Sequence, residues 1–189
     1  EADSFVLDTA NLNASAKGDI LLDSRVNQLQ QVNVANTKGS IAVGNGNTSS
    51  EPLSIAINTP QNVIDGDLTV HNYQNGLANS IVLANKLNAT GTISIIDEEA
   101  AVVVAQNSDI SAKNILLKAI NHNVIMNGGK LTATEKVTFD GVDVIVSGGN
   151  IEAPTAELTA ADDISLNNGT IKAATASLNA QGTSDNENN

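Results

Sequence analysis

The sequence lacks several residue types on which compact domains usually depend. Its 189 residues include no cysteine, no tryptophan, two phenylalanines, one tyrosine and one methionine. The absence of cysteine excludes a disulfide framework and thiol chemistry. Aromatic residues make up only 2% of the chain, whereas a compact globule of this size normally fills its centre with rings. We therefore expect a thin core built from aliphatic side chains.

Positive charge is also scarce. Nine lysines and arginines stand against 21 aspartates and glutamates, so the net charge is −12. Such an acidic surface repels phosphate backbones and anionic lipids, and we expect no nucleic acid partner and no membrane insertion. No apolar run is long enough to span a bilayer, and no signal peptide is evident. Because the sequence begins at Glu1 without a methionine, we expect an excised or mature piece of a longer protein.

What the sequence does contain is a repeat. Three similar segments follow one another every twenty residues or so: MNGGKLTA from Met126, VSGGNIEA from Val146 and LNNGTIKA from Leu166. Apolar and polar residues alternate in three short patches per repeat, with the two-residue period of a strand rather than the 3.6-residue period of a helix. The pattern predicts an all-β fold, a single-stranded parallel β-helix (β-solenoid) with about 20 residues and three short strands per rung. At that period the chain would form about nine rungs, roughly 45 Å of coil.

The alternation also predicts which side chains face the interior of the coil. Equivalent residues of successive rungs stack at the inter-strand spacing of roughly 4.8 Å, so aliphatic columns fill a narrow core. The residues expected to point inward are Ile110, Val124, Met126, Leu131, Val144, Val146, Ile151, Leu158, Ile164, Leu166, Ile171 and Leu178.

Glycine recurs at one place between the patches. Gly129, Gly149 and Gly169 form a column in which we expect the chain to turn with positive φ. Glycine and asparagine tolerate that conformation, whereas branched residues do not. This structural turn column explains why the segments around it repeat.

Polar residues form further columns. Asn123, Asp143 and Asp163 precede the third patch of successive rungs, and we interpret them as caps for backbone groups rather than as a site. Glu152 lies one rung before Lys172, so we expect opposite charges side by side on the outer surface.

The repeat loosens towards the amino terminus without stopping. We expect one β-helical domain over residues 1–182, followed by a polar tail at 183–189. Two segments break the repeat, near 44–62 and at 71–80, and both are rich in the glycine, asparagine and serine of loops. Both are predicted to leave the coil as loop excursions.

The excursion at 71–80 supplies the candidate binding residues. It contains His71 and Tyr73, side chains of the kind that adaptable recognition loops use. We therefore expect any binding to involve His71 and Tyr73 rather than the regular rungs.

The densest acidic run is Asp97-Glu98-Glu99. Three neighbouring carboxylates are a weak candidate for calcium, although a solvated turn is the favoured interpretation. His71 and His122 have no second histidine or cysteine at metal-ligand spacing, so no zinc site is predicted. We expect no metal and no cofactor.

Parallel β-helices also include polysaccharide lyases and glycoside hydrolases. Such enzymes need paired carboxylates, or acids that hold calcium beside a basic residue. Asp162 and Asp163 are adjacent, but neighbours in a strand point to opposite faces. Neither Gly-His-Gly nor Arg-x-Lys occurs in the sequence. We expect a protein without catalytic activity, and a carbohydrate-active β-helix enzyme is the alternative.

The apolar-x-Ala patches and the strings GDILL, ADDISLNNGTIKA and ASLNAQG resemble the repeats of filamentous haemagglutinin-like exoproteins of two-partner secretion systems in Gram-negative bacteria. The resemblance is best over residues 87–182. It implies a right-handed β-helix in a large adhesin or exoprotein that is extracellular or attached to the bacterial cell surface. It also implies an outer-membrane secretion partner.

The same resemblance implies a function. Such a segment would attach to a protein or glycan receptor on host cells, matrix or other bacteria, or would act as a stalk. The Asn-Pro-Asn motif of the family's secretion domain does not occur here, which favours a shaft segment.

Overall fold

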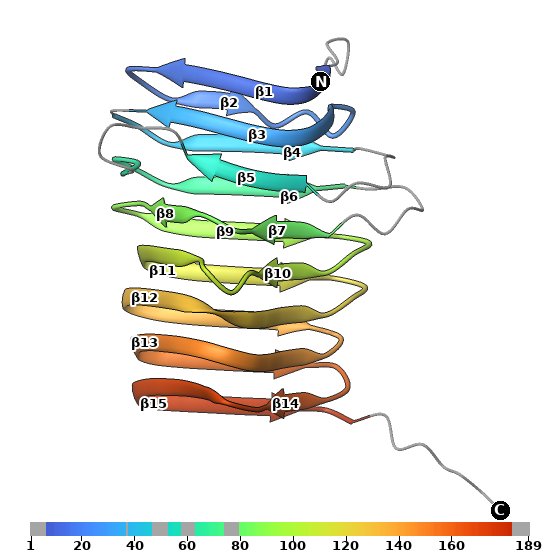
Figure 1. The fold of residues 1–189 in the computed structure, drawn as a ribbon, viewed down its shortest axis with the longest axis vertical. Helices are drawn as coiled ribbons and strands as arrows, with labels where there is room; N and C mark the ends of the chain where they lie inside the picture. Colours follow the sequence, from blue (N-terminus) through green and yellow to red (C-terminus); the bar gives the residue numbers. More distant parts are fainter. Residues whose placement is uncertain (1–6, 37, 47–52, 58–62, 74–79, 183–189) are drawn as a thin grey trace, which may run out of the picture.

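The chain winds into one coil of stacked parallel strands (Figure 1). The computed structural model describes residues 7–36, 38–46, 53–57, 63–73 and 80–182. Its 15 strands belong to a single sheet. Neighbouring strands pair in parallel from one turn of the coil to the next. The predicted all-β, right-handed parallel β-helix is confirmed.

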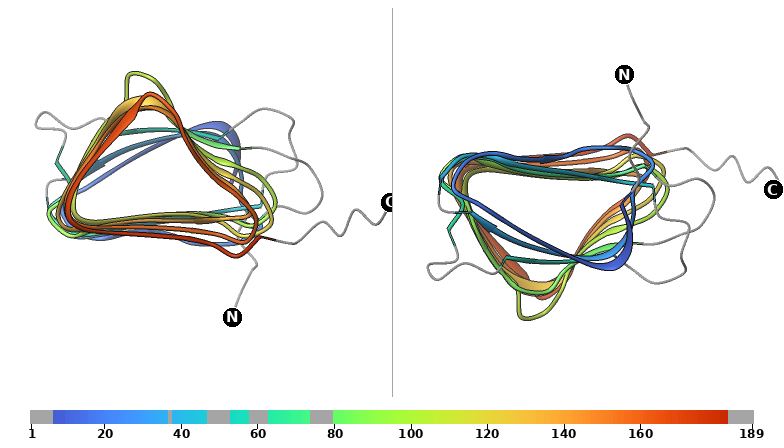
Figure 2. Two further views of the ribbon diagram at one scale, coloured as in Figure 1. Left: turned by 90° about the horizontal axis from the view of Figure 1, so that it is seen from below. Right: turned by 90° about the horizontal axis from the view of Figure 1, so that it is seen from above.

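The strands vary from three to 18 residues in length. They are β1 (Asp8–Ala16), β2 (Ile20–Leu22), β3 (Gln28–Asn36), β4 (Ile41–Asn45), β5 (Leu53–Ile57), β6 (Leu68–Asn72), β7 (Ile81–Leu83), β8 (Lys86–Asn88), β9 (Thr92–Asp97), β10 (Val102–Val104), β11 (Asp109–Ala119), β12 (Val124–Gly141), β13 (Val144–Ala160), β14 (Ile164–Leu166) and β15 (Gly169–Ala180). Viewed along the coil, the later turns have a triangular outline (Figure 2). The described ranges contain no helix long and apolar enough to cross a membrane.

The coil has about seven turns rather than the nine predicted. The prediction applied the spacing of the regular repeats to the whole chain. Asn123 and Asp143, one turn apart, are 20 residues apart in sequence, but Asn45 and Asn72 are separated by 27 residues. The turns between β4 and β9 are longer than 20 residues, so the chain forms fewer turns.

The predicted three short strands per rung are not found in every turn. The early turns have two described strands each, such as β3 and β4, and the third face begins at β8. Later turns fuse the patches, so that β12 and β13 each run through a whole rung. Register shifts within their pairing, between Met126 and Asn127 and between Thr132 and Lys136, mark corners that bend the strands without ending them.

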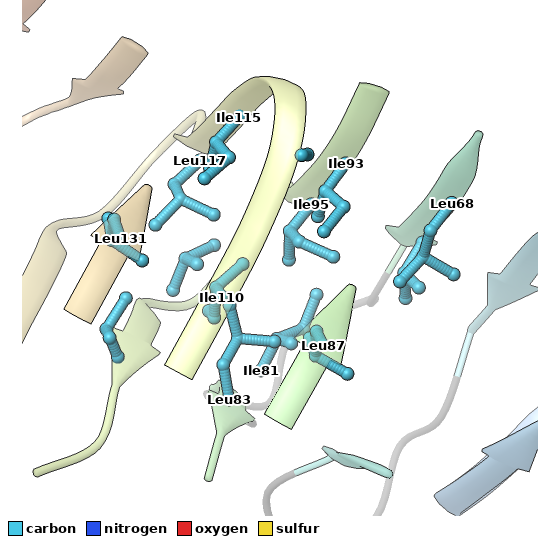
Figure 3. Packing of buried hydrophobic residues seen from close by; sticks show 14 of the residues in the cluster. Leu68, Ile81, Leu83, Leu87, Ile93, Ile95, Ile110, Ile115, Leu117 and Leu131 are labelled. Carbon is cyan, nitrogen blue, oxygen red and sulfur yellow. The ribbon is translucent and has the colours of Figure 1, made fainter. Parts of the chain in front are cut away.

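Aliphatic columns fill the interior of the coil. One column runs unbroken from Leu12 through Val32, Ile55, Leu83, Val104, Met126 and Val146 to Leu166. A second runs from Leu22 through Val43, Val70, Ile95, Leu117, Phe139 and Leu158 to Leu178. Figure 3 shows how Leu68, Ile93 and Ile115 of successive turns line up beside such a column.

Eight of the twelve residues predicted to point inward are buried, and the other four lie in the same columns but are only partly covered. Ile110, Val124, Met126, Leu131, Val144, Val146, Ile151 and Leu158 are buried. The other four, Ile164, Leu166, Ile171 and Leu178, pair in register with buried residues but lie on the last described turn. Leu166 is 47% and Leu178 52% exposed, because no described strand covers that side of the turn.

The turn column is confirmed at two of its three glycines. Gly129 and Gly149 have φ of 76° and 88°. A Cβ on Gly149 would lie 2.6 Å from Cε of Met126. Gly169 does not have positive φ, and the left-handed residue of that turn is Asn168, with φ of 56°. Gly169 pairs with Gly149, and a Cβ there would lie 2.9 Å from Cγ1 of Val146.

The two predicted excursions are partly strand. Within 44–62, Leu53–Ile57 form β5, and Leu53 and Ile55 are buried in the core. Residues 47–52 and 58–62 lie outside the described residues. Within 71–80, His71 and Asn72 end β6, and residues 74–79 are again outside the described part. The sequence pattern did not predict β5, because its alternation covers only a few residues. Pro52 and the glycine-rich string before it suggested a loop instead.

Candidate functional site

Inside the coil, the ends of β4, β6 and β9 carry a column of polar side chains, which we call the polar ladder (Asn45, Asn72 and Asp97). The three residues pair in register on successive turns and have no exposed surface. Asn45 Nδ2 donates to Asn72 Oδ1 at 3.1 Å, and Asn72 Nδ2 donates to Asp97 Oδ2 at 2.9 Å. Each amide therefore donates towards the carboxy-terminal end of the coil.

Asp97 ends the polar ladder because it accepts on both oxygens. Its Oδ1 receives the backbone N–H groups of Glu99 at 3.1 Å and Ala100 at 2.8 Å. An asparagine in its place would turn an N–H group towards one of these donors. Burial raises the pKa of the Asp97 carboxyl, and the hydrogen bonds from Asn72 and the backbone oppose that rise. On the next turn the column continues with Ala119.

On the outer surface beside the polar ladder lies a cluster of four side chains, the aromatic cluster (Arg25, His71, Tyr73 and Glu98). The rings of His71 and Tyr73 stack with centroids 3.7 Å apart. His71 Nε2 lies 3.0 Å from Oε1 of Glu98, and the guanidinium of Arg25 lies 5.0 Å from the centre of the Tyr73 ring. His71 and Tyr73, the two candidate binding residues, thus contact each other, whereas Arg25 and Glu98 lie on other turns and had no signal in the sequence that would link them to this cluster.

Two glycines allow this cluster to form. Gly44 pairs with His71 of the next turn, and a Cβ on Gly44 would overlap the carbonyl oxygen of Asp23 on the turn before. A Cβ on Gly46 would overlap the carbonyl oxygen of Arg25. Because the intervening turn has no side chain at these places, Arg25 on the first turn reaches Tyr73 two turns on.

The aromatic cluster is partly buried, and the pKa values of its members shift accordingly. Burial lowers the pKa of His71 despite the neighbouring charge and hydrogen bond of Glu98, while Arg25 lowers it further. Burial raises the pKa of Tyr73. A neutral imidazole and a neutral phenol are thus favoured near neutral pH, so the cluster offers a ring edge, a hydroxyl and a cation to a ligand.

The acidic run does not converge on one point. Asp97 points into the core, Glu98 faces His71, and Glu99 Oε1 accepts from Nδ2 of Asn121 at 3.4 Å. The described residues contain no group of three or more side chains that could hold a metal ion. A turn lies here, as predicted. The buried Asp97 carboxylate holds it in place by accepting the N–H groups of Glu99 and Ala100.

Two residues of the predicted polar column, Asn123 and Asp143, cap backbone groups, and the third, Asp163, supplies the N–H group that Asp143 caps. Asn123 Oδ1 accepts the N–H of Asp143, and Asp143 Oδ1 accepts the N–H of Asp163, both at 3.2 Å. Asp19 and Asp67 act in the same way earlier in the chain, since their Oδ1 atoms accept the N–H groups of Ser40 at 2.8 Å and Thr92 at 2.6 Å. In the sequence, the Gly-Asp pairs directly before β2 and β6 could have predicted these two caps.

A shallow groove of about 610 Å³ crosses the outer faces of β12, β13 and β15. Its walls include Thr132, Glu152, Pro154 and Lys172. Nζ of Lys172 donates to Oε1 of Glu152 at 2.7 Å, as the sequence predicted. This contact lowers the pKa of Glu152 and raises that of Lys172. Both pKa values move away from neutrality, whereas general acid–base catalysis works best with a pKa near the working pH.

Comparisons with known proteins leave these features to be interpreted on their own. A scan against protein-family models, a search of curated proteins and a search of solved structures each return no match.

Proposed function

We propose that this chain is a non-catalytic β-helical shaft segment of a large secreted or cell-surface exoprotein, which mediates attachment or acts as a stalk. The resemblance of its rungs to filamentous haemagglutinin-like repeats supports the proposal. Such a protein would use an outer-membrane secretion partner and would bind a receptor on host cells, matrix or other bacteria. The alternative is a carbohydrate-active β-helix enzyme.

The observation that carries the proposal is that many charged side chains of the described residues link one turn of the coil to the next. Among the described residues, five lysines form ion pairs with acids of a neighbouring turn, and in three of these pairs the charged atoms lie 2.6 to 2.7 Å apart. The pairs are Lys86–Asp109, Lys113–Glu135, Lys118–Asp140, Lys136–Glu157 and Lys172–Glu152. Asp19, Asp67, Asp97 and Asp143 accept backbone N–H groups. These charged groups contact neighbouring turns, an arrangement that fits a structural role as a shaft.

Attachment would involve the aromatic cluster. Tyr73 and His71 are the stacked aromatic pair on the coil surface, and Arg25 adds a planar cation to them. Stacked aromatic and guanidinium groups bury contact area with little loss of conformational freedom, which favours recognition.

The test is attachment of purified protein, immobilised on beads, to cells and to matrix. We expect Tyr73→Ala to reduce attachment severalfold. Thr69→Ala is the matched control, because Thr69 lies on β6, which ends one residue before Tyr73, and is also half-buried. Equal attachment by the two variants would remove the aromatic cluster from the proposal, and no attachment by the unaltered chain would leave only the stalk role.

The enzyme alternative is tested by incubation with acidic and neutral polysaccharides and detection of new chain ends. Turnover that disappears in Glu152→Gln, in the groove, or in Asp162→Asn would overturn the shaft proposal. Glu157→Gln is the control, because Glu157 forms an equivalent ion pair outside the groove.

A further inference from the structure

One side of the coil differs from the others in charge, and we call it the uncharged face. It consists of β3, β5, β7, β10 and β14 together with residues 124–129 and 144–149, which pair in parallel from turn to turn (Figure 1). These segments contain no charged residue, although 16% of the chain is charged. The five lysine ion pairs of the described residues all lie outside them.

The outward side chains in the middle of the uncharged face are aliphatic. Val82, Val103, Ile125 and Ile145 lie in register on four successive turns and form what we call the aliphatic stripe. Each is half-buried and stands between two buried neighbours of its own strand. Because side chains alternate along a strand, the stripe points away from the core.

The aliphatic stripe ends within the coil and has a polar border. Gln31 and Ser54 precede it in the same column, and Ser165 follows it. Asn127 and Ser147 lie beside it and are exposed. An apolar centre without charge inside a polar rim is the usual composition of a protein interface. Because this face lies on the side of the coil, further turns at either end would not cover it.

Two properties favour a second copy of this chain as the occupant. The net charge of −12 makes two copies repel each other, and this repulsion is weakest where two uncharged faces meet. The stripe also repeats at the inter-strand spacing of roughly 4.8 Å. The stripe of a second copy has the same repeat, so the branched side chains of both can interleave along its whole length, as they do between packed sheets.

The size of the uncharged face suits a reversible dimer. From Gln31 to Ser165 the outward column covers six inter-strand steps, roughly 29 Å, and a segment of six residues is about 20 Å wide. Two such faces would together bury about 1,200 Å², the lower end of the range for specific protein interfaces.

We propose that two copies of this chain pair side by side, with the aliphatic stripe of one against the aliphatic stripe of the other. Both copies contribute the same surface, so the contact has two-fold symmetry and closes at the dimer. The pairing leaves both ends of each coil free for further turns. It goes beyond the proposed function, since neither attachment nor a stalk role requires it.

Sedimentation velocity of the 189-residue chain over a wide concentration range tests the pairing. We expect a monomer and a dimer whose proportion rises with concentration. Ile125→Glu places a charge in the centre of the stripe and should weaken association by at least about tenfold. Far-UV circular dichroism should stay unchanged, because the side chain is only half-buried. Leu116→Glu is the matched control, since Leu116 is also aliphatic, outward and half-buried but lies on β11, outside the uncharged face.

Single cysteines locate the contact without introducing a charge, because the chain has no cysteine of its own. Under mild oxidation, Ile125→Cys should form a disulfide with itself if the two coils run in the same direction. It should form one with Val103→Cys if they run in opposite directions. Leu116→Cys should remain monomeric.

Four results would overturn the proposal. They are a monomer at every concentration, growth beyond the dimer, equal association of Ile125→Glu and Leu116→Glu, and no disulfide of Ile125→Cys in either combination. None of these measurements depends on receptor attachment, so the pairing can fail while the proposed function stands, and the reverse.

Discussion

Replacing Asn72 with alanine should destabilise the coil by about 2 to 4 kcal/mol at neutral pH. The substitution removes the donor to Asp97 Oδ2 and the acceptor of Asn45 Nδ2, both in the interior. Asn45 Nδ2 keeps its bond to the carbonyl oxygen of Leu29 at 3.2 Å. A buried polar group that loses its partner costs about 1 to 3 kcal/mol, and more if it is charged, so Asp97 accounts for most of the loss.

The loss should depend on pH. Burial raises the pKa of Asp97, so the folded state holds this proton more tightly than the unfolded state, and ionisation costs stability as pH rises. The bond from Asn72 lowers that pKa, and its removal raises the pKa further. The additional loss of stability in Asn72→Ala is therefore present above the pKa that Asp97 has in the folded state. It is absent below the ordinary pKa of an aspartic acid. The difference between the two proteins should shrink on acidification.

Urea unfolding followed by far-UV circular dichroism at several pH values measures both effects. Asn33→Ala is the control, because Asn33 makes its bond to Asn13 on the exposed surface, and it should change stability by less than about 0.5 kcal/mol. An Asn72→Ala protein as stable as this control, or a loss that is equal at all pH values, would refute the role given to the polar ladder.

Three further outcomes follow from the same structure. Gly149→Ala should cost more than about 1 kcal/mol in urea unfolding, because its φ is positive and the new methyl group meets Met126; Gly18→Ala, with open space around it, should be far milder. Val146→Asp, at a site only 2% exposed, should cost several kcal/mol, roughly 3 to 5, and Leu166→Asp in the same column much less; equal melting of the two would show that the last turn is covered. His71 has a lowered pKa, so the unfolded chain binds its proton more readily and stability should fall as pH drops through the ordinary histidine pKa and below; an unchanged slope of stability against pH in His71→Gln would contradict this.

Deleting residues 72–79 would not be a clean test of the candidate loop. The sequence alone suggests that this deletion would remove only part of the loop excursion at 71–80. In the structure it also removes Asn72, which joins two turns inside the coil. Loss of attachment in such a variant would therefore reflect loss of folding, and the single substitution of Tyr73 is the better probe.

The sequence by itself determined the fold, because the cause of the fold is local and repeated. Between Met126 and Ala180, twenty-residue spacing places Leu131, Ile151 and Ile171 in one column, and the structure pairs them in that order. Two-residue alternation separates the buried face of each strand from the outer face. Where the repeat is strict, core residues, polar caps and the Glu152–Lys172 pair could all be predicted.

Only the tertiary structure decided the interior of the early turns and the surface beside it. Asn45, Asn72 and Asp97 are 27 and 25 residues apart, so no constant period links them, and asparagine is common in the chain. Arg25 meets Tyr73 only because the turn between them has glycine at the contact. Such contacts depend on the length of each turn, which sets which residues stack, and that length is fixed only when the whole coil is assembled.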